Sequence, residues 1–405
     1  MSNDKPQIEV YPPESYYQME TARYNAGRNV LAFAALISIA LCAFGYWQNP
    51  ARFFQSYLVA FGFVVATGLA SFFFVQVQFL TGSAWSVTVR RIMENILITL
   101  PFCAILFLPI AFGLKDLYSW TNTAMVMADP GLRYKASWIT EHGFITRAYI
   151  YFAVWSLWIF SIYHQSTKQD SEKSIRQMHI LSRWSAPGLF LAVVIGTLGC
   201  YDWFMSLEPK WYSTIFGLYI LSGGAVTFFS ILALICMGFR RAGVLTKAIS
   251  MEHFHDIGKW MFAMTAFYTY IAFAQYLLIW YANLPEETIW YRHRIAGSWF
   301  WIGIAMPFIR FVIPFFTLIC RPAKRSLTVI GLMAVWSIVV EYVDLYWVVM
   351  PVFNKDGIQV HWLDFATLAL TVSTCGLVFW TRFKKNKMVP VGDLRFEQSL
   401  QFENV

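Results

Sequence analysis

Charged residues are scarce in this sequence. They make up 13% of its 405 residues, whereas 58% of the residues are hydrophobic and the mean hydropathy is +0.50. Soluble domains carry about 25% charged residues, so a soluble protein of this length would lack the polar surface that faces water. The composition therefore excludes a soluble globular protein and predicts an integral membrane protein.

Metal-binding patterns are lacking as well. The six cysteines lie in apolar stretches or at their edges without paired spacing, which argues against Fe–S ligands, a zinc ribbon and covalent haem attachment. None of the seven histidines lies deep in an apolar stretch, so no pair is placed to hold a haem between helices. We interpret His253 and His255, two residues apart, as part of a solvated cytoplasmic loop. We therefore expect that this chain holds no metal and no redox cofactor of its own.

Long apolar stretches dominate the chain. Each is close to or above the ~20 residues that cross a hydrocarbon core about 30 Å thick, and the alternating segments of about 10 residues that mark a membrane barrel do not occur. The predicted spans are residues 30–47, 53–80, 92–113, 144–163, 184–205, 212–237, 260–281, 297–320, 326–350 and 362–380. The predicted fold class is therefore all-α, an integral membrane protein with ten transmembrane helices.

The distribution of lysine and arginine predicts the orientation of these helices. With the N-terminus inside, the inside segments hold 21 of these residues and the outside loops hold 9, while Arg310 within a span completes the 31. This asymmetry follows the positive-inside rule and predicts that both termini are cytoplasmic. The net charge of +8 is thus a topology signal, and we expect no binding of nucleic acid.

The spans divide the chain into three parts. Residues 1–29 form a polar cytoplasmic arm that lacks the features of a secretory signal, and residues 30–381 form the membrane domain. Residues 382–405 form a basic cytoplasmic tail, which we interpret as an anchor that contacts lipid headgroups.

A few charged residues lie inside or at the ends of the spans. A charge near the bilayer centre costs at least about 2.5–3.5 kcal/mol on insertion scales, which makes such residues functional candidates. Asp202 lies late in the fifth span, just before a turn in which Pro209 ends the helix. Glu341 and Asp344 lie on one face of the ninth span, and Arg310 lies in the eighth span between two prolines that should kink it.

These residues suggest two half-paths for protons. The outer half contains Asp202, Glu341 and Asp344 with Asp364 and His361 at the mouth of the tenth span, and the inner half contains Arg310, Glu94 and His164. The alternative is that Arg310 neutralises one acid as a structural buried pair. Three or more acids for one arginine would leave carboxyls without a countercharge, which suits proton exchange. We expect Asp202 to face the bundle interior as an outer-side exchanging acid.

A polar stripe on the seventh span offers a second kind of site. Thr265, Tyr268 and Gln275 share one helical face, and His142 lies at the outer start of the fourth span. Such groups can line a pocket for a quinone headgroup or hold bridging waters. The alternative is that they bond neighbouring helices to each other.

Three stretches carry a resemblance to a known family. They are DWFMSLEPKWYSTIFGLY, HDIGKWMFAMTAFYTYIAFAQYLLIWYANLPEETIWY and TGSAWSVTVRR. They resemble the large membrane subunits of alternative complex III, a bacterial quinol:cytochrome c or oxidase-linked oxidoreductase, in the NrfD/polysulfide-reductase membrane-subunit family. The resemblance spans nearly the whole chain and implies two four-helix bundles with flanking helices. Of the two sister subunits in that complex, the length and the short arm resemble the second more than the first.

The family resemblance also implies partners and a location. It implies the bacterial inner membrane, quinol or menaquinol as the reductant, and partner subunits that carry the redox groups. These partners are an Fe–S protein, multihaem and monohaem c-type cytochromes with haem c, a sister subunit, small membrane subunits and a terminal oxidase. In the sister subunit the resemblance implies a quinol pocket near the outer side with a histidine and an aspartate, where Asp202 is suitably placed here.

The expected function is therefore a membrane subunit of a respiratory quinol oxidoreductase, without its own redox metal, that contributes a proton path. Two alternatives remain open. Interior charges and proline-broken helices are also typical of secondary transporters. A passive scaffold in the same complex would need the same fold but no conducted protons.

Overall fold

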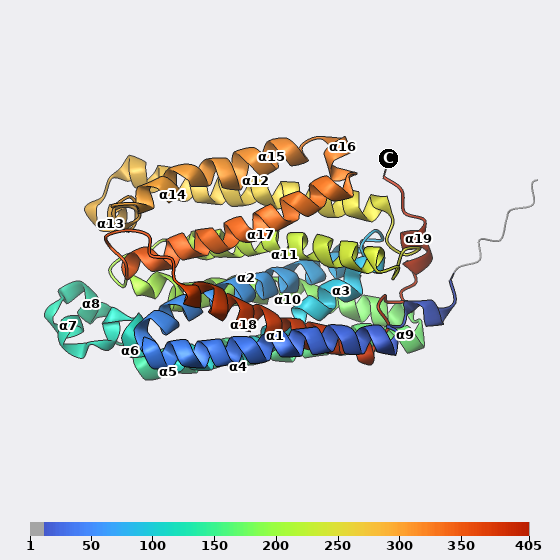
Figure 1. Ribbon diagram of the computed structural model, residues 1–405, viewed down its shortest axis with the longest axis horizontal. Coiled ribbons are helices and arrows are strands. Elements are labelled where there is room, and N and C mark those ends of the chain that lie inside the picture. Colours follow the sequence, from blue (N-terminus) through green and yellow to red (C-terminus); the bar gives the residue numbers. More distant parts are fainter. Residues whose placement is uncertain (1–11, 405) are drawn as a thin grey trace, which may run out of the picture.

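The structure is a computed structural model and describes residues 12–404, so residues 1–11 of the predicted arm and Val405 lie outside the described residues. Within this range there is no strand, and ten helices are long and apolar enough to cross a membrane. The all-α membrane class predicted from composition is confirmed. The long helices lie side by side along the longest axis of the molecule (Figure 1).

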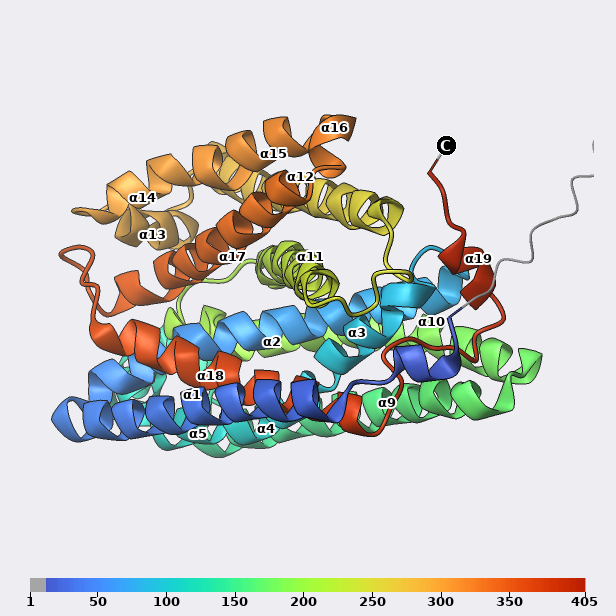
Figure 2. The ribbon, with the colours of Figure 1, turned by 45° about the vertical axis from the view of Figure 1, so that its right-hand side comes forward.

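The first bundle consists of four membrane-length units. They are α2 (Pro50–Thr81), the broken helix made of α3 (Val87–Leu97), α4 (Thr99–Leu106) and α5 (Leu108–Phe112), α9 (Glu141–Glu172) and α10 (Ile175–Trp203). Two flanking helices, α1 (Thr21–Gln48) and α18 (Trp362–Thr381), pack against each other, and α18 also packs on α2. Figure 2 shows α1 and α18 along one side of this bundle.

The second bundle contains the remaining spans. They are α11 (Phe216–Arg241), α12 (Met251–Ala282), the broken helix made of α14 (Trp299–Met306), the π-helical η4 (Pro307–Val312) and α15 (Ile313–Leu318), and α17 (Leu327–Val349). The predicted arrangement of two four-helix bundles with flanking helices is therefore present. The bundles meet where α2 packs against α11 and α17.

Shorter helices connect these spans. They are η1 (Glu14–Tyr17), α6 (Leu114–Leu117), η2 (Ser119–Thr121), α7 (Thr123–Ala128), α8 (Pro130–Lys135), η3 (Met205–Leu207), α13 (Pro285–Arg294), α16 (Arg321–Lys324), η5 (Met350–Val352), η6 (Arg382–Lys384) and α19 (Phe396–Leu400). The blue N-terminal segment and the C-terminus lie at one end of the molecule, and α6, α7, α8 and α13 lie at the other (Figure 1). Both ends of the described chain are thus on one side, as an even number of spans requires.

The seam between the bundles is tight because it is built on glycine. A methyl group on Gly224 of α11 would lie 2.4 Å from the backbone oxygen of Ala66 on α2, so only glycine permits this approach. Small residues at helix contacts allow such close packing in membranes. α2 is the most enclosed span, with 94% of its apolar window buried.

Several helices extend beyond the predicted spans. α9 runs to Glu172 although its predicted span ends at residue 163, and α12 begins at Met251 although its predicted span begins at residue 260. Helical backbone continues past the hydrocarbon because the polar residues there can face water. The interpretation of His253 and His255 as a solvated loop is wrong, because both lie buried near the start of α12, where the His253 ring caps the helix with Ser250.

The C-terminal segment is also more ordered than a simple tail. Met388 and Val389 are fully buried, and Ser399 of α19 accepts a hydrogen bond from the backbone N–H of Thr88 on α3. The segment therefore packs across the inner ends of the helices. Lys384 and Lys385 remain exposed there, where they could contact headgroups.

Candidate functional site

A buried polar cluster lies inside the second bundle. Its members come from four helices and are Tyr219 on α11, Tyr268 on α12, Arg310 on η4, and Glu341 and Asp344 on α17. All five are buried, and we call them the central cluster. The spacing of three residues between Glu341 and Asp344 places both carboxyls on one face of α17, as predicted.

Arg310 and Glu341 form a direct ion pair in this cluster. Arg310 Nη2 donates a hydrogen bond to Glu341 Oε2, and the guanidinium carbon lies 4.0 Å from the centre of the Tyr268 ring. Gly223 makes room for the pair, since a Cβ there would lie 2.7 Å from both Glu341 oxygens. Arg310 Nε and Nη1 are buried and have no hydrogen-bond partner among the described residues. These two donors are therefore free to bind water.

The backbone around Arg310 is unusual. Residues Pro307–Val312 form a π-helix, and Pro314 follows one turn later. Prolines lack the N–H that an α-helix needs, and π-turns occur often at functional sites. The predicted break in this helix is confirmed, and it takes the form of a π-turn.

Asp344 has a different environment from Glu341. The Tyr219 hydroxyl donates to Asp344 Oδ1 at 2.6 Å, and the Tyr268 hydroxyl donates to Oδ2 at 2.7 Å. No arginine bonds this carboxyl among the described residues. The central cluster thus contains one guanidinium and two carboxyls, of which only Glu341 has a charged partner.

A second polar group lies at the outer end of the same bundle. Glu208 follows η3, and its Oε1 accepts a hydrogen bond of 2.9 Å from Arg294 Nη1, with His293 Nδ1 at 3.5 Å. The Arg294 guanidinium stacks 3.6 Å from the Trp290 ring centre. Burial by itself raises the pKa of Glu208, but the charge of Arg294 and hydrogen bonds from His293 and Arg294 outweigh it and hold the pKa below its usual value.

Tyr291 lies close to Arg294 of the outer group and to Gln275. Burial raises the pKa of its hydroxyl, while a hydrogen bond with Gln275 and the charge of Arg294 oppose the rise, and the charge of Asp344 adds to it. Tyr291 therefore interacts with both Arg294 and Asp344. We call Gln275, Tyr291, Arg294, Glu208 and His293 the outer polar chain, and its end at His293 has a side chain 35% exposed.

Asp202 is held in the first bundle by hydrogen bonds from two residues of α9. Arg147 Nε and Nη2 each donate to its carboxylate at 2.8 Å, and the Tyr151 hydroxyl donates at 2.9 Å. The residue is buried and faces the bundle interior, as predicted. Arg147 and Tyr151 lie four residues apart on α9, a spacing that places them on one face and could have indicated this contact from the sequence.

The premise that one arginine serves all the buried acids is wrong. Arg147 pairs with Asp202, Arg52 with Asp364, and Arg91 with Glu94. The sequence placed these arginines in loops or near span ends. Their long side chains reach the carboxyls of neighbouring helices, as amphipathic side chains commonly do.

Asp364 and His361 form a helix cap at the outer end of α18. Arg52 Nη2 donates to both Asp364 oxygens at 2.9 and 2.7 Å, and the Ser56 hydroxyl donates at 2.6 Å. The His361 N–H donates to Asp364 Oδ2 at 2.8 Å, and the His361 ring accepts from the N–H of Leu363. These contacts satisfy the orphan donors of the first turn, so the geometry is that of a capping box.

Glu94 belongs to an inner cluster of five charged groups, of which four are buried and Asp170 is partly buried. Arg91 Nη1 and the Ser166 hydroxyl donate to Glu94 at 2.8 and 2.7 Å. Arg91 also bonds Asp170 at 2.7 Å, and Arg90 bonds Asp393 of the C-terminal segment at 2.6 Å. We call Arg90, Arg91, Glu94, Asp170 and Asp393 the inner cluster. Sequence reasoning found only Glu94, because Asp170 and Asp393 are distant in the chain.

His164 does not join the inner cluster. It is exposed on α9, whereas its neighbours Tyr163 and Ser166 are buried and face Asn95 and Glu94. Successive helical residues point in different directions, and His164 lies on the outward face. The sequence predicts His164 at the inner end of this span, and the structure turns its side chain away from Glu94.

The structure places the predicted quinone-pocket residues on two helices. Thr265, Tyr268 and Gln275 are buried on α12, whereas His142 is exposed at the start of α9. None of these four residues lines the apolar crevice or the larger polar cavity described below. In the structure Tyr268 bonds Asp344, and Gln275 bonds Ser213 and Tyr291.

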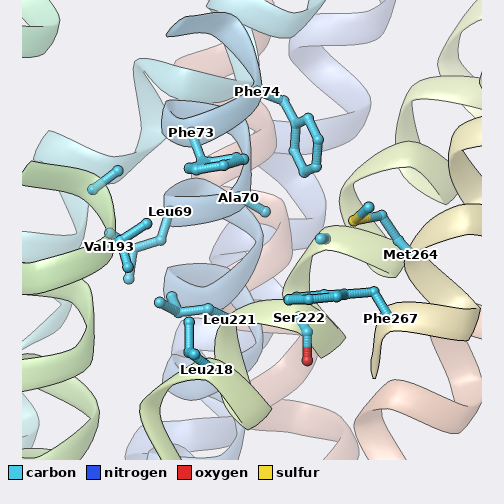
Figure 3. A pocket seen from close by; sticks show the side chains of 12 residues that line it. Leu69, Ala70, Phe73, Phe74, Val193, Leu218, Leu221, Ser222, Met264 and Phe267 are labelled. Atoms are coloured by element: carbon cyan, nitrogen blue, oxygen red, sulfur yellow. The ribbon is translucent and has the colours of Figure 1, made fainter. Parts of the chain in front are cut away.

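One cavity is an apolar crevice of about 130 Å³ between the two bundles. Figure 3 shows its walls, which come from α2, α10, α11 and α12 and include Phe73, Phe74 and Phe267. Its one hydroxyl, that of Ser222, donates to the Tyr219 backbone oxygen at 2.9 Å. The crevice therefore offers nothing that would bond a polar headgroup.

The second cavity, about 380 Å³, lies at the end opposite the termini. Its walls are Lys135, Trp138, Ile139, Leu198, Tyr201, Asp202, Met205, Ser206, Pro209, Trp211 and Tyr212. We call it the outer cavity. It contains a lysine and a carboxylate beside apolar and aromatic walls.

No family model matches the chain, and no curated protein matches it either. Within residues 12–404, no three histidine, cysteine, aspartate or glutamate side chains converge as metal ligands would.

Proposed function

We propose that this chain is the membrane subunit of a respiratory quinol oxidoreductase and that Asp344 is its proton-exchanging group. The observation that supports the proposal most directly is that Asp344 is buried between two tyrosine hydroxyls and that no arginine within residues 12–404 bonds it. The sequence resemblance to alternative complex III supports the assignment to a quinol oxidoreductase.

The chemistry of the partners distinguishes Asp344 from the other buried acids. An arginine has five donors and no acceptor, so a carboxyl that takes up a proton loses its bond to the guanidinium. Breaking a buried pair of this kind costs about 3–5 kcal/mol. A tyrosine hydroxyl both donates and accepts, so it can rotate and stay bonded to Asp344 in either protonation state.

Charge balance in the central cluster also favours Asp344 as the proton-exchanging group. With both carboxyls ionised, Arg310 would leave one buried negative charge without a countercharge, which is costly in an apolar interior. One proton on Asp344 makes the cluster neutral. Uptake and release of this proton is the step that we assign to the subunit.

The outer polar chain gives the proton a route to one surface. In this proposal the proton passes from Asp344 by way of Gln275 and Tyr291 to Arg294 and Glu208, and Glu208 contacts the partly exposed His293. The unpartnered donors of Arg310 can hold waters that complete the links. On the inner side Glu94 is bonded by Arg91, so the same argument gives it a role in helix contacts and not in proton exchange.

The electrons would travel through partner subunits. In this proposal an Fe–S protein and c-type cytochromes carry them from quinol or menaquinol, and a sister subunit, small membrane subunits and a terminal oxidase complete the assembly. The location would be the bacterial inner membrane. Asp202, Glu341 and Asp364 would then stabilise helix contacts through their arginines.

Irregular backbone in two of the spans makes a secondary transporter the second candidate function. Besides η4, the third span has local turns at Ile98 and Phe107, where its backbone stays right-handed helical. Paired discontinuous helices are typical of secondary transporters. Isolation of the native protein separates the two functions, because co-purified haem-bearing partners support the oxidoreductase and a solitary protein that transports a solute supports the transporter.

The proton role is tested with Asp344→Asn in the reconstituted complex. Asparagine keeps the size but cannot exchange a proton at physiological pH, so we expect electron transfer with fewer protons moved per electron. Asp356→Asn, an exposed aspartate in the outer loop, is the matched control and should leave the ratio unchanged. Full coupling in Asp344→Asn would reject the proton role and leave the scaffold.

A further inference from the structure

The outer cavity lies where membrane lipid can reach it. Its walls combine the end of α8, the last turns of α10 and the connection from η3 to α11. Leu198 on α10 is 36% exposed, so this wall faces the surroundings of the helix bundle. Trp138 and Tyr212 are also exposed there, and such aromatic residues are typical of the level of the lipid headgroups.

Lys135 is the one cation that lines this cavity, and no carboxylate pairs with it among residues 12–404. Its Nζ donates to the backbone oxygen of Pro209 at 2.9 Å and lies 5.5 Å from the centre of the Tyr212 ring. Burial lowers the pKa of the Lys135 ammonium, because the group gives up water without gaining a countercharge. A bound anion would supply that countercharge.

The nearby charges are already balanced. Asp202 also lines the cavity, but Arg147 bonds both of its oxygens. Lys210, two residues before Tyr212, pairs with Asp129. Lys135 is therefore the place in the cavity wall where an anion would gain most.

We propose that the outer cavity binds an anionic phospholipid, with the phosphate at Lys135 and an acyl chain against Ile139, Leu198 and Met205. A phosphate oxygen accepts from an ammonium as a point charge, which suits lysine. The apolar walls match a chain and the lysine matches the headgroup, so both parts of the ligand have a partner. This inference is independent of the proton path.

The experiment measures lipid retention on the purified full chain. The protein is delipidated in detergent, titrated with dioleoyl phosphatidylglycerol or dioleoyl phosphatidylcholine, and examined by native mass spectrometry. The wild type should bind phosphatidylglycerol more tightly than phosphatidylcholine. In Lys135→Gln this preference should fall about fivefold, the effect expected for one basic residue near an anionic lipid.

Matched variants test whether Lys135 itself holds the anionic lipid. Lys210→Gln removes a lysine of the same outer surface that already has an acid partner, and it should keep the preference. Lys135→Arg should also keep the preference for phosphatidylglycerol. Leu198→Trp, which fills the cavity from its exposed side, should weaken the binding of both lipids. Equal binding of the two lipids, or equal loss in Lys135→Gln and Lys210→Gln, would overturn the proposal. Displacement of phosphatidylglycerol by a short-chain quinol would also overturn it, since the cavity would then be a quinol site.

Discussion

The hydroxyl of Tyr268 donates a hydrogen bond of 2.7 Å to Asp344. The ring of the same tyrosine lies under the guanidinium of Arg310, whose carbon is 4.0 Å from the ring centre. Tyr268 therefore touches both the fixed ion pair and the acid that we propose to exchange protons. Any change in the charge of Asp344 acts on Arg310 through this side chain.

Removing the tyrosine hydroxyls should impair proton exchange without removing the acid. In Tyr268→Phe, Asp344 loses one of its two hydrogen bonds but keeps the one from Tyr219. A hydrogen bond to a charged group contributes about 1.5–3 kcal/mol, so the ionised form of Asp344 should become harder to reach. We expect fewer protons per electron in Tyr268→Phe and fewer still in the double variant with Tyr219→Phe, measured in liposomes with the reconstituted complex.

Tyr270→Phe is the control for this pair. Tyr270 lies on the same helix but is exposed, so loss of its hydroxyl should leave the ratio unchanged. An unaltered ratio in the double variant would show that the hydroxyls are not needed for proton movement.

Asp202 should contribute to the stability of the fold and not to the number of protons moved per electron. Asp202→Asn keeps one carbonyl oxygen that can accept from Arg147, but it loses the negative charge and the second acceptor, so we expect a cost of about 1–3 kcal/mol. Thermal unfolding in detergent should show a lower midpoint, and the protons moved per electron should stay at the wild-type value. A normal midpoint with a lowered proton yield would instead identify Asp202 as the exchanging acid.

The sequence predicted the membrane class and the candidate acids better than their partners. Apolar length determines whether a helix can cross a bilayer, so ten spans could be counted without a structure. The contacts of Asp202 and Glu94 depend on arginines that the charge pattern assigns to loops or helix ends. Hydropathy is a local average and cannot show which way a long side chain reaches.

Tyr219 shows a second limit of the sequence. It ends one of the stretches that carry the family resemblance, yet it is one of 21 tyrosines, many of which lie at helix ends. Its role becomes visible only when α11 and α17 pack and its hydroxyl meets Asp344. His164 shows the opposite case, because its residue type attracted attention while its helical face turns outward.

A methyl group at Gly223 should disturb the central cluster. In Gly223→Ala the new carbon would lie 2.7 Å from both Glu341 oxygens and 2.8 Å from Arg310 Nη2, so the ion pair would have to move. Overpacking of this kind costs about 1–3 kcal/mol. We expect a lower midpoint of thermal unfolding and a reduced proton yield.

Gly238→Ala on the same helix is the matched control, because nothing lies within 4 Å of its Cβ position. Alanine is also the better helix former, so this control should unfold at the wild-type temperature or slightly above it. Equal behaviour of the two variants would mean that the space at Gly223 is not needed by the ion pair.

The ion pair between Asp393 and Arg90 should make the C-terminal segment sensitive to acid. Burial by itself raises the pKa of Asp393, but the charge of Arg90, the Arg395 N–H and the Arg395 charge outweigh it, so the folded pKa lies below the usual value. A lowered folded pKa adds stability that is fully present above the unfolded pKa of about 3.9 and is lost as the pH falls through the folded pKa. Asp393→Asn removes the negative charge beside Arg90 but leaves an acceptor oxygen and the 3.5 Å contact of Arg90 with Glu94, so it should cost about 1.5–3 kcal/mol near neutral pH.

The pH dependence of the thermal midpoint distinguishes the contribution of the Asp393–Arg90 ion pair from that of apolar packing. The difference in thermal midpoint between the wild type and Asp393→Asn should be constant from pH 5 to pH 8 and should shrink below about pH 4, where the wild-type carboxyl takes up a proton. Glu397→Gln, an exposed acid on α19, is the control and should show no such difference at any pH. If the gap between wild type and Asp393→Asn persists unchanged in acid, the segment is held by the buried Met388 and Val389 alone. The charge of Asp393 would then have no part in closing the inner end of the bundle.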